Sequence, residues 1–345
     1  MFEHLEKIES LAIVGATGLV GKEFLEILED HKVAIPKLKF LASKRSAGEY
    51  IRHQGKEHLV EELAEDSFNG IEVAFFSVPK EVSARYIPSA VNAGATVIDD
   101  SNLYRMEPGV PLVVPQVNGE SLKHFEGKIL TTPNCSTTPL AMCLKPLLDN
   151  YGVSRVVAST YQAVSGAGQS AFDELSKQTI QLMNGNSPDV KVFPHRIAFN
   201  CLPQIGSVLE NGNTDEEEKV IRELRKILET PNLKVSATAV RVPTFCGHGL
   251  SVNVELENDF GSVDEIRELL EGFPGIRVVD NPASHIYPTN IECVKSNYTF
   301  VGRIRRDQSV PSGINFWVIA DNLRKGAALN VLETLESLYS YRSLH

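Results

Sequence analysis

The sequence predicts an α/β protein whose first part forms a doubly wound, mostly parallel sheet. Short apolar runs that are typical of buried strands alternate there with amphipathic segments, and the first run ends in a glycine-rich turn. Near residue 151 the pattern changes, and later strands alternate apolar with polar residues, as half-buried antiparallel strands do. The 345 residues are enough for two domains of ordinary size.

Four apolar runs predict the strands of the first part, at residues 11–14, 38–42, 73–78 and 95–99. The first strand is followed by apolar residues at helical spacing, namely Val20, Phe24, Ile27 and Leu28. A second helix is expected over residues 81–93, with Ala84, Ile87 and Val91 on one side. Strands that alternate with helices favour a parallel sheet with helices on both faces.

The second part is predicted to hold strands at residues 155–163, 235–243, 250–257 and 314–319. Helices are expected at residues 140–148 and 170–184, with a loop at residues 185–196. Within the third of these strands Leu250, Val252, Val254 and Leu256 face one way, which predicts a single buried face. The last helix, over residues 323–339, is expected to return to the first domain.

The composition is that of a globular protein with an acidic surface. Acidic residues outnumber basic ones by 44 to 34, and the net charge of −10 argues against binding to nucleic acid or anionic membranes. No apolar run approaches the ~18 residues of a membrane span, and the charged first ten residues do not match a secretory signal. The cysteines, at positions 135, 143, 201, 246 and 293, form no CxxC pair, so neither a metal site nor a disulfide framework is expected. A reducing cytoplasm is the simplest location.

The glycine-rich turn predicts a dinucleotide site of the Rossmann type. Residues 15–21, Gly-Ala-Thr-Gly-Leu-Val-Gly, follow a strand and open a helix, which is the context that this motif requires. Gly15 permits the tight turn, and Gly18 lets a phosphate approach the backbone. The cofactor contacts expected here are Gly15, Thr17, Gly18, Leu19 and Val20.

The segment after the second strand predicts a preference for NADP. An NAD site usually places an acidic residue about 20 residues beyond the glycines, to bind the ribose diol. Here the strand leads into Ser43-Lys44-Arg45-Ser46, and no carboxylate appears before Glu49. We therefore expect Arg45 and Ser46 to bind the 2′-phosphate. A solvated basic loop is the competing interpretation, above all for Lys44.

One cysteine stands where a helix is expected to begin. Cys135 lies in Pro133-Asn134-Cys135-Ser136-Thr137, just before an apolar helix that has Pro139 in its first turn. The positive end of a helix favours a thiolate, which is the nucleophilic form of cysteine. A nucleotide-binding half followed by such a thiol predicts a dehydrogenase with a covalent intermediate. Among the other thiols, Cys143 is expected to be buried, and Cys246 is the best competitor because it is close to His248.

Together these motifs resemble the aspartate-semialdehyde dehydrogenase family over nearly the whole chain. The matching segments, in order, are residues 15–21, 43–48, 113–118, 133–137, 161–168, 240–243 with His248, and 321–328. The resemblance implies an NADP-binding domain over residues 1–132, to which residues 321–345 return. It implies a catalytic and dimerisation domain over residues 133–320, an α+β unit with a mixed, largely antiparallel sheet.

The function that the resemblance implies is reduction of L-aspartyl 4-phosphate by NADPH, with loss of phosphate, to aspartate 4-semialdehyde. This reaction would serve the biosynthesis of lysine, threonine, methionine and diaminopimelate. Partners would be these small substrates, phosphate and further copies of the chain, in a cytoplasmic dimer or tetramer, without nucleic acid or membrane.

The resemblance also implies a role for each matching residue. Cys135 would be the nucleophile, and His248, expected in a loop between two strands, the acid/base group. The substrate-binding residues would be Arg241 for the α-carboxylate, Gln162 for positioning, Glu216 for the ammonium, and Lys219, Arg105 and Asn134 for phosphate. Ser165, Gly166 and Asn322 would lie against the nicotinamide.

Several of these positions have a second interpretation. Thr214 and Glu217 match a helix capping box, so the acidic residues around Glu216 also suit a helix start. Arg241 could be an exposed strand residue, Arg105 a solvated loop residue, and Asn322 a helix N-cap. Gly249-Leu250 follow His248 where relatives often carry polar residues, so the sequence does not reveal what orients this imidazole.

Two related enzymes and a non-catalytic paralogue compete with this assignment. N-acetyl-glutamyl-phosphate reductase usually has Pro-Gly before its cysteine and Tyr after it, whereas this chain has Asn134 and Ser136. The Ser-Cys-Thr-Thr-Asn sequence of glyceraldehyde-3-phosphate dehydrogenase is absent. A non-catalytic paralogue would be expected to lose the thiol, and Cys135 is present.

Overall fold

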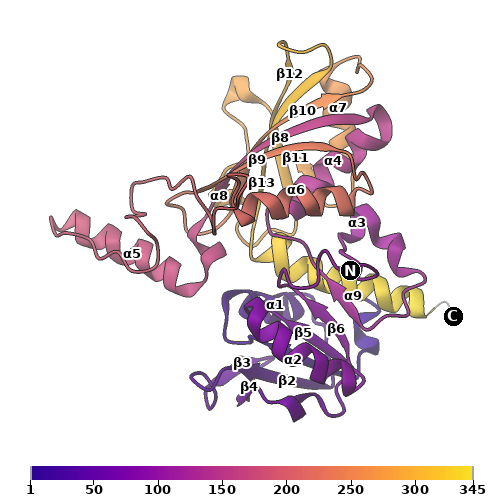
Figure 1. The fold of residues 1–345 in the computed structure, drawn as a ribbon, viewed down its shortest axis with the longest axis vertical. Helices are drawn as coiled ribbons and strands as arrows, with labels where there is room; N and C mark the ends of the chain where they lie inside the picture. Colours follow the sequence, from indigo (N-terminus) through magenta and orange to yellow (C-terminus); the bar gives the residue numbers. More distant parts are fainter. Residues whose placement is uncertain (1, 344–345) are drawn as a thin grey trace. The chain divides into compact units, whose positions relative to one another are not determined.

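The computed structural model describes residues 2–343, so residues 1 and 344–345 of the expected first domain lie outside the described residues. The chain divides into two compact units (Figure 1). One comprises the chain up to Asn134 and the segment from Ala327 onward, and the other is Cys135–Gly326. The divisions therefore fall after residues 134 and 326, whereas the sequence placed them after residues 132 and 320.

The first unit is built on a seven-stranded sheet in the order β3-β4-β2-β1-β5-β6-β7. The strands are β1 (Ser10–Val14), β2 (Lys37–Ala42), β3 (Tyr50–His53), β4 (Lys56–Glu62), β5 (Val73–Phe76), β6 (Thr96–Asp99) and β7 (Ile129–Thr131). All neighbouring strands are parallel except β3 and β4, which form an antiparallel hairpin. The predicted doubly wound, mostly parallel sheet is confirmed.

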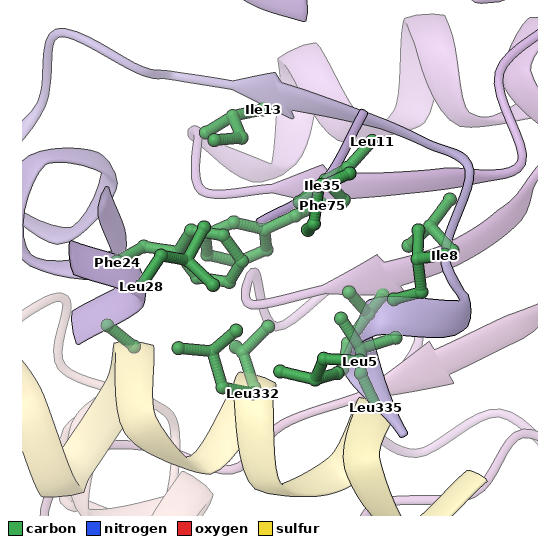
Figure 2. Packing of buried hydrophobic residues seen from close by; sticks show 14 of the residues in the cluster. Leu5, Ile8, Leu11, Ile13, Phe24, Leu28, Ile35, Phe75, Leu332 and Leu335 are labelled. Atoms are coloured by element: carbon green, nitrogen blue, oxygen red, sulfur yellow. The ribbon is translucent and has the colours of Figure 1, made fainter. Parts of the chain in front are cut away.

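Helices cover both faces of this sheet, because successive residues of a strand point to opposite sides. The helices of the unit are α1 (Leu19–Asp30), α2 (Lys80–Asn92), α3 (Pro115–Asn118) and α9 (Leu329–Arg342). Leu11 and Ile13 of β1 pack with α1 and α9 on one face, whereas Ala12 and Val14 pack with α2 on the other. Figure 2 shows Phe24 of α1 and Leu332 of α9 pointing into the first of these clusters.

The first unit differs from the expectation in two places. The buried side of α2 consists of Ser83, Ile87 and Ala90, so the expected place of Ala84 on it is wrong and its small side chain is exposed. The strands β3, β4 and β7 were not predicted. β3 and β4 are largely exposed, and their residues show no continuous apolar run by which a strand could be found.

The second unit contains a six-stranded sheet in the order β11-β12-β13-β10-β8-β9. The strands are β8 (Val153–Gln162), β9 (Lys234–Arg241), β10 (His248–Leu256), β11 (Ile276–Val278), β12 (Thr299–Asp307) and β13 (Gly313–Ala320). Three neighbouring pairs are antiparallel, and β8–β9 and β11–β12 are parallel. The mixed, largely antiparallel sheet is confirmed, but the antiparallel pairing expected for β9 is wrong, because alternation reports half-burial and not strand direction.

The helices of the second unit are α4 (Thr137–Tyr151), α5 (Gln169–Met183), α6 (Asp215–Ile227), α7 (Val263–Glu271) and α8 (Asn290–Cys293). α6 packs against β9 and α4, while α5 extends away from the sheet of its unit (Figure 1). The single last helix expected at residues 323–339 is wrong in detail, since a π-helical turn at Arg324–Ala328 precedes α9. None of the helices in residues 2–343 combines the length and apolar character that crossing a membrane requires.

Candidate active site

The thiol of Cys135 lies immediately before α4, which begins at Thr137. It is half-buried, at the end of the helix where the backbone dipole is positive, so its surroundings favour the thiolate. Two other thiols are poor nucleophiles. Burial raises the pKa of Cys143, which sits inside α4, and raises that of Cys293 to about 12. The five cysteines form no disulfide with one another.

Gln162, the last residue of β8, links the start of α4 to α6. Its side chain is 1% exposed, and its Nε2 donates to Ser136 Oγ at 3.0 Å and to Glu216 Oε1 at 3.2 Å. The amide is therefore fixed beside the residue that follows Cys135. This contact brings two of the predicted substrate-binding residues together.

In the first turn of α6, different residues cap the helix and belong to the candidate site. The capping box is present: Thr214 Oγ1 accepts from Glu217 N at 3.3 Å, and Glu217 Oε2 accepts from Thr214 N at 2.7 Å. Glu216 is not used for capping, and its carboxylate lies 3.1 Å from Lys219 Nζ. Burial alone would lower the pKa of Lys219, but the carboxylates of Glu216 and Asp215 raise it. Glu216 and Lys219, which were expected to bind different parts of the substrate, thus form a partly buried ion pair.

Arg241 ends β9 and is 6% exposed, so the interpretation as an exposed strand residue is wrong. Its Nη1 donates to the carbonyl of Ala163 at 2.8 Å. Burial lowers the pKa of the guanidinium, while Glu216 and the Cys135 thiolate act in the opposite direction. Arg241 is therefore within electrostatic reach of both groups, and it is a buried cation beside the thiol.

The sequence predicted His248 in a loop, but the structure shows it as the first residue of β10, paired with Ala320 of β13. The backbone N–H of Ala163 donates to its Nδ1 at 3.0 Å, so in the neutral ring the proton belongs on Nε2. Burial, followed by the positive charge of Arg241, lowers its pKa to about 3. The group that orients His248 is thus a backbone amide, which no side-chain motif could reveal.

Ala163 therefore serves both predicted groups, with its N–H on His248 and its carbonyl on Arg241. Gly166 lies against the same two side chains. A Cβ built on it would stand 3.0 Å from Arg241 Nη1 and 3.0 Å from His248 Nε2. Nε2 has no hydrogen-bond partner among the described residues. The missing side chain of residue 166 leaves space in front of both groups.

Asn322 and Ser165 form a second buried contact close by. Ser165 Oγ lies 3.1 Å from Asn322 Oδ1 and 3.0 Å from its Nδ2. Asn322 is not the N-cap that the sequence allowed, because Asp321 Oδ1 accepts from Leu323 N at 2.9 Å and from Arg324 N at 3.1 Å. The amide of Asn322 is consequently directed at the loops of the site.

The glycine turn of the first unit has the shape that a dinucleotide needs. Gly15 has φ +92°, and a Cβ there would lie 2.2 Å from the carbonyl oxygen of Ser77. Its N–H donates to the carbonyl of Leu41 at 2.8 Å, which ties the turn to the end of β2. α1 begins at Leu19 behind Gly18, which offers no capping side chain. Open backbone at a helix N-terminus suits a pyrophosphate, so these residues fit the cofactor.

The remaining predicted residues also lie in the first unit. Arg45 is exposed and Ser46 half-buried, in the turn that follows β2 and so next to the glycine turn. Arg105 is 6% exposed, and its Nη2 donates to the carbonyl of Asp100 at 2.7 Å, so it is not a solvated loop residue. Asn134 is buried at the end of the unit. Within the described residues no group of three acidic, histidine or cysteine side chains could hold a metal ion.

Comparison with known families agrees with this division. Residues 10–125 match the model of the NAD binding domain of semialdehyde dehydrogenases, and residues 144–325 match the model of their dimerisation domain. The fold and the site define an NAD(P)-dependent dehydrogenase. The aspartate-semialdehyde dehydrogenase of Aquifex aeolicus (strain VF5) is 46% identical over 331 residues, which cover 95% of this chain and 97% of that protein. The chain belongs to the aspartate-semialdehyde dehydrogenase family.

Solved structures are similar over the same extent. A crystal structure of aspartate semialdehyde dehydrogenase II from Vibrio cholerae, complexed with ASA, has a TM-score of 0.91 and 39% identity, covering 96% of this chain and 98% of that one. Aspartate semialdehyde dehydrogenase from Candida albicans, crystallised with NADP, has a TM-score of 0.75 and 26% identity, covering 97% and 99%.

Proposed function

We propose that this chain reduces L-aspartyl 4-phosphate to aspartate 4-semialdehyde with NADPH, through a thioester on Cys135. The observation that supports this most directly is the buried network of Gln162, Glu216, Arg241 and His248 beside the start of α4. It combines a cation, an anion and an imidazole next to one thiol. These are the groups that an α-amino acid with a reactive carbonyl requires.

The substrate's amino-acid end would be bound by opposite charges. Arg241 offers a planar fork that can clamp the α-carboxylate through two parallel hydrogen bonds. Glu216 would accept from the ammonium, and Gln162 would hold the chain between them. Lys219, together with Arg105 and Asn134, would bind the phosphate. An N-acetylated substrate has no ammonium, so a buried carboxylate at residue 216 would oppose it.

Cys135 would carry the substrate through the reaction. Its thiolate attacks the acyl carbon, a C–S bond forms, and the C–O bond to phosphate breaks as phosphate leaves with the electron pair. NADPH, when bound, supplies the hydride that reduces the thioester carbon. The Nε2–H of His248 would donate to the oxygen on which negative charge then develops. When the C=O bond re-forms, the C–S bond breaks and the thiolate of Cys135 is regenerated.

The preference for NADP would come from the turn after β2. Arg45 and Ser46 would bind the 2′-phosphate, and no acidic residue stands there to bind the ribose diol of NAD. Gly15, Thr17, Gly18, Leu19 and Val20 would hold the pyrophosphate, while Ser165, Gly166 and Asn322 would contact the nicotinamide. The NADP in the Candida albicans relative supports this choice.

The setting that we propose is biosynthesis of lysine, threonine, methionine and diaminopimelate in the cytoplasm. Cysteines that form no disulfide with one another suit a reducing compartment. The match to a dimerisation domain supports a homodimer, which could pair further into a tetramer.

The test is reduction of NADP by aspartate semialdehyde, with and without inorganic phosphate. The wild type should require phosphate, and Cys135→Ala should lose at least about 1000-fold in kcat. Cys201→Ala, which removes an exposed thiol, is the matched control and should keep full activity. Activity without phosphate would mean simple aldehyde oxidation, and an active Cys135→Ala would exclude the thioester. In the same assay Arg45→Glu should raise the KM for NADP and leave that for NAD unchanged.

A further inference from the structure

The backbone on both sides of the Gly247 Cα, directly before His248, is held by asparagine side chains. Its N–H donates to Asn322 Oδ1 at 3.0 Å, and its carbonyl accepts from Asn290 Nδ2 at 2.6 Å. Asn290 is the first residue of α8, a one-turn helix that no motif singled out. Two amides from different segments therefore fix the two peptide groups that flank the Cα of Gly247.

The backbone at Gly247 is pressed against α8. Gly247 has φ +84°, and a Cβ there would lie 2.7 Å from Cys293 Sγ and 3.1 Å from the carbonyl of Asn290. Both the left-handed conformation and the close approach require glycine. Because His248 follows directly, a change in this contact would displace its ring.

The other side of the imidazole depends on a neighbouring turn. Val164 N donates to the carbonyl of Thr244 at 2.9 Å, and Ser165 N donates to that of Phe245 at 3.1 Å. Ser165 also contacts Asn322, as described above. The segment before His248 is therefore tied to the turn whose Ala163 N–H donates to Nδ1.

We propose that Asn290 and Asn322 are positioning residues that keep His248 in its neutral, Nε2-protonated form. By fixing Gly247 they hold Nδ1 within reach of the Ala163 N–H, which leaves only Nε2 to carry the proton. The inference rests on the proposed function, in which that N–H donates to the developing oxyanion. Asn290 is the cleaner probe, because it is assigned no contact with substrate or cofactor.

The first experiment replaces Asn290 and measures steady-state kinetics. Asn290→Ala removes the donor, whereas Asn290→Asp places a carboxylate against the carbonyl of Gly247. We expect kcat to fall about tenfold in the first and further in the second, with the KM for aspartate semialdehyde and NADP within about twofold of wild type. Ile291→Ala, on the same short helix and 87% exposed, is the matched control and should behave as wild type.

The second experiment detects the tautomer directly. In ¹⁵N-histidine spectra, the signals of His248 are identified by their loss in His248→Gln. The wild type should show the Nε2-protonated pattern. The His248 ring should not titrate between pH 8 and 5, and the charged groups that face it are Arg241, Glu216 and Cys135. Asn290→Asp should show a mixture of tautomers or a pKa closer to that of a free imidazole.

The outcomes separate this inference from the proposed function. Wild-type kcat in Asn290→Asp, or an unchanged tautomer pattern, would overturn the positioning role. Equal losses in kcat and in the rate of Cys135 alkylation would indicate general damage to the fold and would also overturn it. If the wild type lacks phosphate-dependent activity, the proposed function fails, while the spectra still decide the role of Asn290.

Discussion

Arg241 is the residue whose surroundings say most about substrate binding. A buried guanidinium is costly unless its hydrogen bonds are satisfied. Within residues 2–343 the guanidinium of Arg241 donates only through Nη1, to the carbonyl of Ala163. Its burial also explains why its pKa is lowered although Glu216 and the Cys135 thiolate oppose the change. The remaining donors suit a planar carboxylate.

We predict that Arg241→Lys lowers kcat/KM for aspartate semialdehyde by about 100-fold, because an ammonium cannot make two parallel bonds and would not hold the Ala163 carbonyl at the same place. Steady-state kinetics measure the loss. The rate of Cys135 alkylation is the control and should change little. Retained catalytic efficiency in this variant would contradict the clamp.

Site residues could be predicted where their side chains belong to a recognisable sequence motif. Cys135 follows from its place before an apolar helix, and the family resemblance adds Gln162, Glu216, Arg241 and His248. The structure places all five in one unit. What orients them could not be found in this way. The amide of Ala163 is backbone, and Asn290 stands in an exposed stretch where a single asparagine has no distinguishing neighbour.

Among the elements, α6 combines stability and function in its first turn. Thr214 and Glu217 close the helix end, and Glu217 Oε1 also accepts from Ala239 N at 2.9 Å, which fixes α6 on β9. Glu216 and Lys219 are carried on the same turn. Loosening this cap should therefore affect the site as well as the fold.

We predict that Thr214→Ala lowers the free energy of unfolding by about 1 kcal/mol and raises the KM for aspartate semialdehyde. Urea unfolding and steady-state kinetics measure the two effects. Ser262→Ala is the matched control. Ser262 caps α7 by accepting a hydrogen bond from Glu265 N, and α7 carries no predicted site residue. This control should lose similar stability without a change in KM; equal effects of both variants on KM would refute the link.

Elements with an apolar stripe could be predicted, and the others could not. Three of the predicted strands, β1, β5 and β6, are buried along their whole length, and β2 is buried at its C-terminal end. Their apolar runs are therefore visible in the sequence. β12 alternates buried residues with exposed arginines and is interrupted by a bulge between Gly302 and Arg305. The direction of β9 depends on its partner strand, which local sequence does not contain.

At the scale of the whole molecule, the buried imidazole makes stability depend on pH. The pKa of His248 is lowered to about 3 in the folded chain, first by burial and then by Arg241. Below the ordinary value of 6.5 the unfolded chain binds a proton that the folded chain does not, so stability rises with pH across this window. The contribution of the neutral ring is complete above pH 6.5 and is lost as the pH falls towards 3.

We predict that the wild type loses about 2 kcal/mol more of its free energy of unfolding than His248→Asn between pH 7 and pH 5. Denaturant unfolding at both pH values measures the difference. Burial also lowers the pKa of His53, which adds to the slope of both proteins and cancels in the comparison. Parallel pH dependences would show that His248 is protonated in the folded chain.

The return of α9 to the first unit has a consequence for synthesis on the ribosome. Leu332 and Leu335 complete the apolar cluster that begins with Leu5, Leu11 and Phe24 (Figure 2). These leucines are translated only after the 192 residues of Cys135–Gly326 (326 − 135 + 1), which form a compact unit of their own. Until then only α1, of the two helices on this face, covers the sheet in the nascent nucleotide-binding half, so its apolar cluster stays incomplete. The second unit, inserted within the first along the chain, can complete its own core earlier.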